Sequence, residues 1–164
     1  MPRIISSSSQ KQHLSSLSRR IFAKKSTLMV HITRRERFSA AHKLARKDWS
    51  EEKNYEVFGK CSNPNWHGHN YVLYVTVKGK PEPSTGFVVD LSALGDLIKS
   101  NVIDHIDHKN MNVDVEFMKG LMTSTENIAI AIWNQLEKPV ADLGATLHCV
   151  KLHETENNYV EYFG

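Results

Sequence analysis

Cys61 to Asn70 reads Cys-Ser-Asn-Pro-Asn-Trp-His-Gly-His-Asn, with His67 and His69 on either side of one glycine. The apolar residues that follow alternate with other residues and predict a β-strand: Tyr71, Leu73, Val75 and Val77. Residues i and i+2 of an extended segment point to the same face, so both histidines share a face where the strand begins. Neutral imidazole is the commonest metal ligand, and the glycine leaves room beside it. Alone, the stretch fits a metal site or a surface turn.

A third histidine, His42, lies 25 residues before His67 in a segment that we expect to form the neighbouring strand. Residues 31–44 alternate in polarity, with Phe38, Ala40 and His42 on one side. Catalytic zinc usually has three protein ligands and one open position. An all-imidazole set without carboxylate or thioether favours zinc over copper or iron. We therefore predict that His42, His67 and His69 bind one Zn²⁺.

Cys61 has two interpretations. It could be a fourth metal ligand, which would close the site and make it structural. It could instead be a free thiol near the cation, serving as a nucleophile or base. We favour the second, because the Pro64 loop can hold the thiol away from the ion. For Cys149, on a strand near the C-terminus, we expect a buried structural role.

Two further groups of titratable residues stand out. Asp107 precedes His108 in a polar segment, where a carboxylate beside an imidazole can form an acid–base relay, or simply cap local amides. Glu154 follows an apolar strand and shares its buried face, so it needs a partner. That partner could be a planar ligand with two adjacent N–H donors, or a salt bridge to Lys151 or Arg37.

The remaining patterns predict a compact α+β domain with the order ββααββ, an antiparallel sheet and two helices on one face. Residues 45–66 are expected to be a long functional loop, and residues 104–114 a polar loop. One helix follows Asp90 or Ser92, and a second follows a capping box formed by Thr123 and Glu126. Pro139 and Gly144 are expected to end the second helix. The other predicted strands are a short one at 87–89 and two at 147–153 and 159–163.

Composition sets the class of protein. At 164 residues and 40% hydrophobic content the chain suits one globular domain, and no apolar run is long enough for a membrane span. Two cysteines suggest a reducing compartment. Residues 1–35 carry eight basic and no acidic residues, so the rest is net acidic, which argues against nucleic acid as a partner.

The N-terminal segment 1–30 is a Ser- and Arg-rich leader ahead of a domain spanning residues 31–164. Its composition fits a mitochondrial transit peptide, a disordered leader, or the product of a start upstream of Met29. We expect a cytoplasmic protein, with mitochondrial targeting as the alternative.

Six motifs in order resemble the 6-pyruvoyltetrahydropterin synthase family over about residues 33–164. They are Phe-Ser-Ala-Ala before His42, Phe-Gly-Lys before Cys61, His67-Gly-His69-Asn, Asp107-His108-Lys-Asn, Ser-Thr125-Glu-Asn and Glu154-Thr-Glu-Asn-Asn. Each motif alone is modest, but the ordered set is highly specific.

The resemblance implies a tunnelling-fold (T-fold) subunit that forms barrel-shaped trimers, stacked into a homohexamer with active sites between subunits. It implies conversion of 7,8-dihydroneopterin triphosphate to 6-pyruvoyl-tetrahydropterin and triphosphate, in tetrahydrobiopterin biosynthesis. By position, His42, His67 and His69 would bind Zn²⁺ and Cys61 would be the base. Asp107 and His108 would form the relay, and Glu154 and Thr125 would contact the pterin. Mg²⁺ could accompany the triphosphate.

Three alternatives remain. The nearest is the relative that makes 6-carboxy-tetrahydropterin for deazapurine (queuosine) synthesis. The five residues between Cys61 and His67 match instead the spacing of the animal-type synthase. A zinc hydrolase would be expected to carry a Glu beside the histidines, as in His-Glu-x-x-His, and this chain lacks it. A non-catalytic pterin-binding module would not need Cys61, Asp107 and His108.

Overall fold

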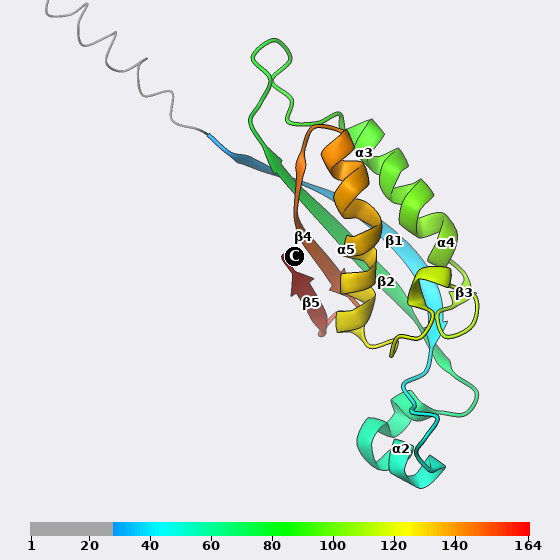
Figure 1. The fold of residues 1–164 in the computed structure, drawn as a ribbon. Helices are drawn as coiled ribbons and strands as arrows, with labels where there is room; N and C mark the ends of the chain where they lie inside the picture. The colour runs from blue at the N-terminus through cyan, green and yellow to red at the C-terminus, as the bar shows by residue number, and fades with distance from the viewer. Residues whose placement is uncertain (1–27) are drawn as a thin grey trace, which may run out of the picture.

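The computed structural model describes residues 28–164, where five strands form one sheet in the order β3-β1-β2-β4-β5 (Figure 1). The strands are β1 (Val30–His42), β2 (His67–Gly79), β3 (Lys109–Asn110), β4 (Thr146–His153) and β5 (Tyr159–Tyr162). The α-helices are α2 (Glu51–Phe58), α3 (Leu91–Ile98), α4 (Asp104–Ile106) and α5 (Thr125–Asp142). The transit-peptide interpretation falls on residues outside the described part.

The long strands β1 and β2 run antiparallel and form the centre of the sheet. Their register pairs His42 with His67, Ala40 with His69 and Phe38 with Tyr71. The inward face of β2 is fully buried from Tyr71 to Val77, which is the alternation expected when one face of a strand packs on a core. The predicted α+β class and the main ββααββ order are therefore confirmed.

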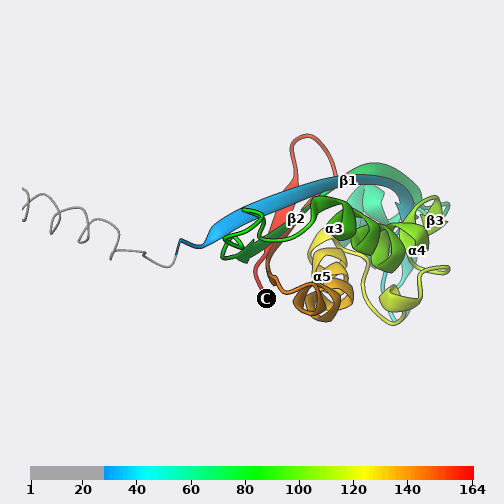
Figure 2. The same ribbon diagram turned by 90° about the horizontal axis from the view of Figure 1, so that it is seen from above.

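Helices α3 and α5 lie on the same side of the sheet, as Figures 1 and 2 show. Helix α5 packs on β4 and β5 through a buried stripe at helical spacing: Ile128, Ile132, Trp133, Leu136 and Val140. A π-helical turn, Lys99–Ile103, joins α3 to α4. The segment after it carries Asp107 and His108 to the edge of β1, where the short strand β3 pairs parallel with it.

The predicted N-cap of α5 and the predicted role of Pro139 need correction, whereas Gly144 follows the end of the helix as expected. The N-cap is Ser124, whose side chain accepts a hydrogen bond from the Asn127 amide, while Thr123 is fully buried. Pro139 lies inside the last turn, so it does not end the helix. The chain leaves the helix at Gly144, whose φ of 83° suits glycine.

The expected loops also contain more structure than predicted. The 45–66 segment contains helix α2, which projects beyond the ends of β1 and β2 (Figure 1). Only Asn54 of α2 is buried, so the helix lacks the apolar stripe that a sequence pattern can detect. The 104–114 segment contains α4 and β3, whereas the predicted strand at 87–89 is absent and Phe87 is 62% exposed.

The opposite face of the sheet carries polar side chains. On β1 the alternation that buries Phe38 leaves Thr33, Arg35 and Arg37 exposed on this face, which we call the open face. No helix within residues 28–164 is both long and apolar enough to cross a membrane.

Asn54 holds helix α2 to the chain before it, and its loss should loosen this segment. Its side chain accepts from the Arg46 amide at 2.7 Å and donates to the carbonyl oxygens of Arg46, Trp49 and Ser50. Because a buried network loses these bonds together, Asn54→Ala should speed limited proteolysis within residues 45–66. Lys53→Ala, on the exposed side, is the matched control; equal cleavage of both variants would contradict the prediction.

Candidate metal centre

Three imidazoles meet where β1 ends and β2 begins. The ligand-capable atoms of His42, His67 and His69 all lie within 4.8 Å of one another. Their ring centroids are separated by 4.5 Å (His42–His67), 5.2 Å (His42–His69) and 4.9 Å (His67–His69). The sequence prediction that these residues come together is confirmed.

The three imidazoles have free ring nitrogens and favour the neutral form that binds a cation. His42 Nδ1 donates to the carbonyl oxygen of Thr123 at 2.8 Å, which leaves Nε2 as the free ligand atom. His42 Nε2, His67 Nδ1 and His69 Nε2 are buried without a hydrogen-bond partner. Burial lowers the pKa of all three imidazoles and so favours the neutral form that binds metal. These residues fit a bound divalent metal ion.

The backbone around His67 is tightly constrained. A Cβ on Gly68 would lie 3.1 Å from the Ala40 carbonyl oxygen, so a larger residue there would require the two strands to shift by a few tenths of an ångström. Trp66 adopts a φ of 59°, an unusual backbone conformation for a bulky residue. Strain of this kind persists only where surrounding contacts impose it, and here it adjoins a candidate ligand.

Glu154 lies beside the histidines after the end of β4. Its Oε1 is 3.7 Å from His42 Nε2 and 4.0 Å from His69 Nε2, and it accepts a hydrogen bond from Thr125 Oγ1 at 2.9 Å. Lys151 instead pairs with Glu161, so the salt bridge considered from sequence for Glu154 does not form with Lys151. The structure thus brings Glu154 and Thr125 together at the metal centre.

Cys61 lies at the end of the segment that contains α2, where a backbone hydrogen bond joins it to the start of that segment. Its carbonyl oxygen accepts from the Leu44 amide at 2.8 Å, and its thiol is free and partly exposed. The thiol does not belong to the histidine group. This arrangement is compatible with the interpretation of Cys61 as a free thiol near the ion. Cys149 is buried, as predicted.

Asp107 and His108 form a hydrogen-bonded pair at the edge of β1. His108 Nδ1 lies 2.9 Å from Asp107 Oδ2, and Asp107 Oδ1 accepts from the Ser39 amide at 2.8 Å. That amide lowers the pKa of Asp107, with a smaller contribution from His108. The imidazole is 82% exposed and, among residues 28–164, makes no hydrogen bond or ion pair with the histidine cluster. The pair borders a hollow of about 910 Å³ along the open face, which Glu154 also lines.

Comparison with known proteins identifies the family of this chain. The family model described as 6-pyruvoyl tetrahydropterin synthase matches residues 31–164. The chain belongs to this family. It is 46% identical over 135 residues to the 6-pyruvoyl tetrahydrobiopterin synthase of Pongo abelii, covering 82% of this chain and 92% of the relative.

A solved structure and a more distant relative also match this chain. The structure of Caenorhabditis elegans 6-pyruvoyl tetrahydropterin synthase matches with a TM-score of 0.77 and 40% identity, covering 83% of this chain and 96% of that one. The 6-carboxy-5,6,7,8-tetrahydropterin synthase of Rickettsia typhi is 31% identical over 150 residues, covering 81% of this chain and 99% of the relative. The T-fold subunit expected from the motifs is therefore confirmed.

Two residues of this family member were not anticipated as parts of the site. Thr123 orients His42 through its carbonyl oxygen, but its sequence position suggested only a helix cap. Tyr71 is fully buried with an unpartnered hydroxyl, and its ring stands edge-on to His69 at 5.7 Å. Burial, followed by the nearby Glu154 and Cys61, raises the pKa of the Tyr71 phenol.

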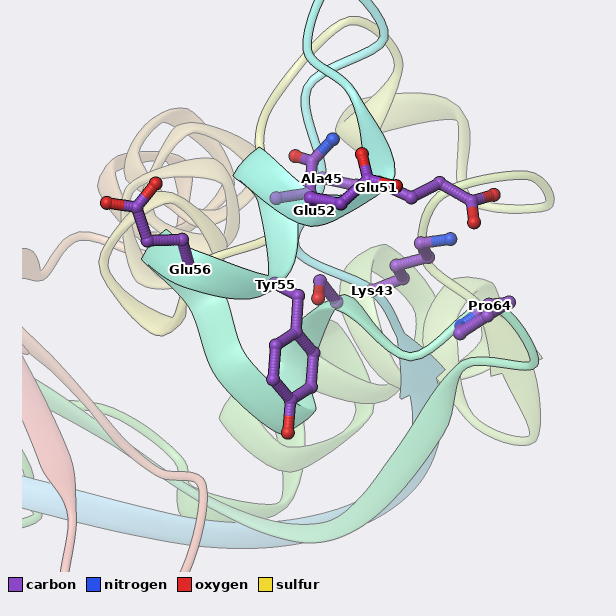
Figure 3. Close-up of a pocket in the computed structure, with 9 residues that line it drawn as sticks. Lys43, Ala45, Glu51, Glu52, Tyr55, Glu56 and Pro64 are labelled. Atoms are coloured by element: carbon purple, nitrogen blue, oxygen red, sulfur yellow. The ribbon is translucent and has the colours of Figure 1, made fainter.

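A separate hollow of about 490 Å³ lies under helix α2 (Figure 3). It is lined by Glu51, Glu52 and Glu56 from the helix and by Lys43 and Pro64 from the flanking chain. None of the predicted site residues lines it. It contributes nothing to the metal centre.

Removing one imidazole should abolish tight metal binding. His69→Ala leaves two ligands, so we expect the affinity for a divalent metal to fall by more than about 100-fold, beyond the loss typical of an outer partner. Calorimetric titration of the metal-free protein measures this affinity. His153→Ala, at a strand histidine outside the cluster, should bind metal normally; unchanged binding by His69→Ala would contradict the site.

Proposed function

We propose that this chain converts 7,8-dihydroneopterin triphosphate to 6-pyruvoyl-tetrahydropterin with release of triphosphate, in tetrahydrobiopterin synthesis. The observation that carries the proposal is the histidine triad with Glu154 and Thr125 beside it, in a chain 46% identical to a relative of that name. The metal would be Zn²⁺, because the ligand set is all imidazole. When bound, the ion would act as a Lewis acid on substrate oxygens.

The protein groups have distinct roles in this proposal. The Glu154 carboxylate, held by Thr125, accepts hydrogen bonds from adjacent N–H groups of the pterin ring and so orients it. The Cys61 thiolate removes a proton from a side-chain carbon of the substrate. His108, oriented by Asp107, exchanges protons with the substrate at a second position. The loss of triphosphate and the internal rearrangement require no external oxidant or reductant.

We further propose a homohexamer with active sites shared between subunits. The exposure of the His108 imidazole, which makes no hydrogen bond or ion pair with the triad among residues 28–164, supports this arrangement, because a second copy could complete each site. Residues 31–164 would form the catalytic domain and residues 1–30 a leader, in a cytoplasmic enzyme. Mitochondrial targeting by the leader is the alternative. Mg²⁺ could accompany the substrate triphosphate.

A second candidate is the 6-carboxy-tetrahydropterin activity named for the Rickettsia relative, which is 31% identical to this chain. The five-residue interval between Cys61 and His67 favours the pyruvoyl reaction. A binding module without turnover is the remaining candidate.

The decisive experiment incubates the full chain with 7,8-dihydroneopterin triphosphate and Mg²⁺, with and without a zinc chelator, and resolves the products by mass. We expect triphosphate and a pyruvoyl-bearing pterin, both lost on chelation and restored by Zn²⁺. Release of the two outer side-chain carbons as an aldehyde, with the first carbon kept on the ring as a carboxylate, would assign the 6-carboxy reaction. Pterin binding without turnover would leave a binding module.

Cys61→Ala tests the base directly. General acid–base groups contribute about 100- to 10,000-fold, so turnover should fall by at least about 100-fold while zinc content stays unchanged. Metal analysis and single-turnover kinetics on the same preparation give both values. Cys149→Ala is the matched control for loss of a thiol. Parallel loss of zinc and activity would make Cys61 a ligand instead.

Glu154→Gln tests the pterin anchor. The amide keeps the size of the side chain but loses its charge and one acceptor oxygen, so pterin affinity should fall by about tenfold or more. Equilibrium binding of 7,8-dihydroneopterin measures the change. Glu156→Gln, two residues along, is the control; similar affinities for both variants would contradict the anchor.

A further inference from the structure

Two arginines of β1 stand together on the open face without an acidic partner. Arg35 and Arg37 are both exposed and, two positions apart on one strand, project to the same side. Among residues 28–164 neither forms an ion pair. Arg34, which projects to the other side, is paired with Glu36 at 2.7 Å. The positive charge of the open-face pair is therefore available to a ligand.

These arginines line the same hollow as the Asp107–His108 pair. Ser39 anchors that pair: its amide binds Asp107 Oδ1 at 2.8 Å, and its carbonyl oxygen accepts from the His108 amide at 2.6 Å. Arg37 is the next residue on the same face of β1, about 7 Å along the strand from Ser39. A molecule in contact with the His108 imidazole thus lies within reach of the Arg37 guanidinium.

The carboxylates of the hollow do not neutralise this charge. Asp107 is bound to His108 and the Ser39 amide, and Glu154 is held by Thr125. Glu156 also lines the hollow but forms no ion pair with either arginine. Arg35 Cζ lies 6.0 Å from the centroid of the Tyr74 ring, which restrains that side chain from below. Arg37 and Arg35 thus follow Ser39 along one face of β1, and neither guanidinium is in an ion pair among residues 28–164.

We propose that Arg37 and Arg35 bind the triphosphate of the substrate, with Arg37 nearer the reacting carbon atoms. The inference rests on the proposed function, which supplies a polyanionic leaving group. Guanidinium binds phosphate oxygens with two parallel N–H donors, and its charge compensates the charge that develops as triphosphate departs. Asp107 and His108 are bound to Ser39 and line the same hollow as the two arginines, so all four residues act on one substrate even where sites are shared between subunits.

The test compares three ligands on the full-length zinc-loaded protein: 7,8-dihydroneopterin triphosphate, 7,8-dihydroneopterin and inorganic triphosphate. Losing a charge-assisted contact should raise the KM of Arg37→Ala for the substrate by about 10- to 100-fold. The affinity for inorganic triphosphate should fall by a similar factor, while the affinity for 7,8-dihydroneopterin stays unchanged. Arg37→Lys should be intermediate, because a point charge remains without the bidentate geometry.

Controls separate this inference from the proposed function. Arg34→Ala removes the same charge from the other face of β1 and should leave inorganic triphosphate binding unchanged. If the wild type turns over and the Arg37→Ala and Arg35→Ala variants keep its KM and its affinity for inorganic triphosphate, the inference is overturned and the proposed function is not. Absence of turnover in the wild type would overturn the proposed function, while calorimetry with inorganic triphosphate would still judge the arginines. Equal weakening of all three ligands would indicate a structural effect and contradict the inference.

Discussion

The antiparallel register of β1 and β2 is the constraint on which the site depends. It sets His42 opposite His67 and Ala40 opposite His69, so three imidazoles converge from two strands. A slip of one residue would turn one strand's histidines to the other face. The core prevents that slip, because it would expose Phe38 or Tyr71 to water. Hydrophobic burial along the strands thus specifies the geometry of the metal centre.

Contacts from distant segments complete the centre. The Thr123 carbonyl selects the tautomer of His42 across 81 positions of sequence, and Thr125 holds Glu154 across 29. Thr125 is the first residue of α5 and Thr123 immediately precedes its N-cap, and α5 itself packs on β4. Packing of this helix therefore positions a ligand and a carboxylate together. Loss of such an outer contact typically costs about 10- to 100-fold in metal affinity or activity.

The two faces of the sheet carry different functional groups. The imidazoles share their face with the buried residues of β2, under the helices, while Arg35, Arg37 and Ser39 belong to the open face. Burial on the first face keeps the imidazoles neutral for metal binding. Exposure on the second leaves the guanidiniums hydrated and free to bind an anion. Glu154 lies beside the histidines and also lines the hollow of the two arginines, so one substrate can contact both groups.

Local periodicity was sufficient to predict β1, β2 and the histidine triad, because alternating burial and the i, i+2 spacing are properties of the chain itself. The same information missed helix α2, whose exposed surface carries no apolar stripe, and it placed the cap of α5 one residue early. Thr123 became a partner of His42, and Asp107 and His108 came to rest against Ser39 of β1, only through tertiary packing. Such contacts join residues far apart in sequence, and no local pattern encodes them.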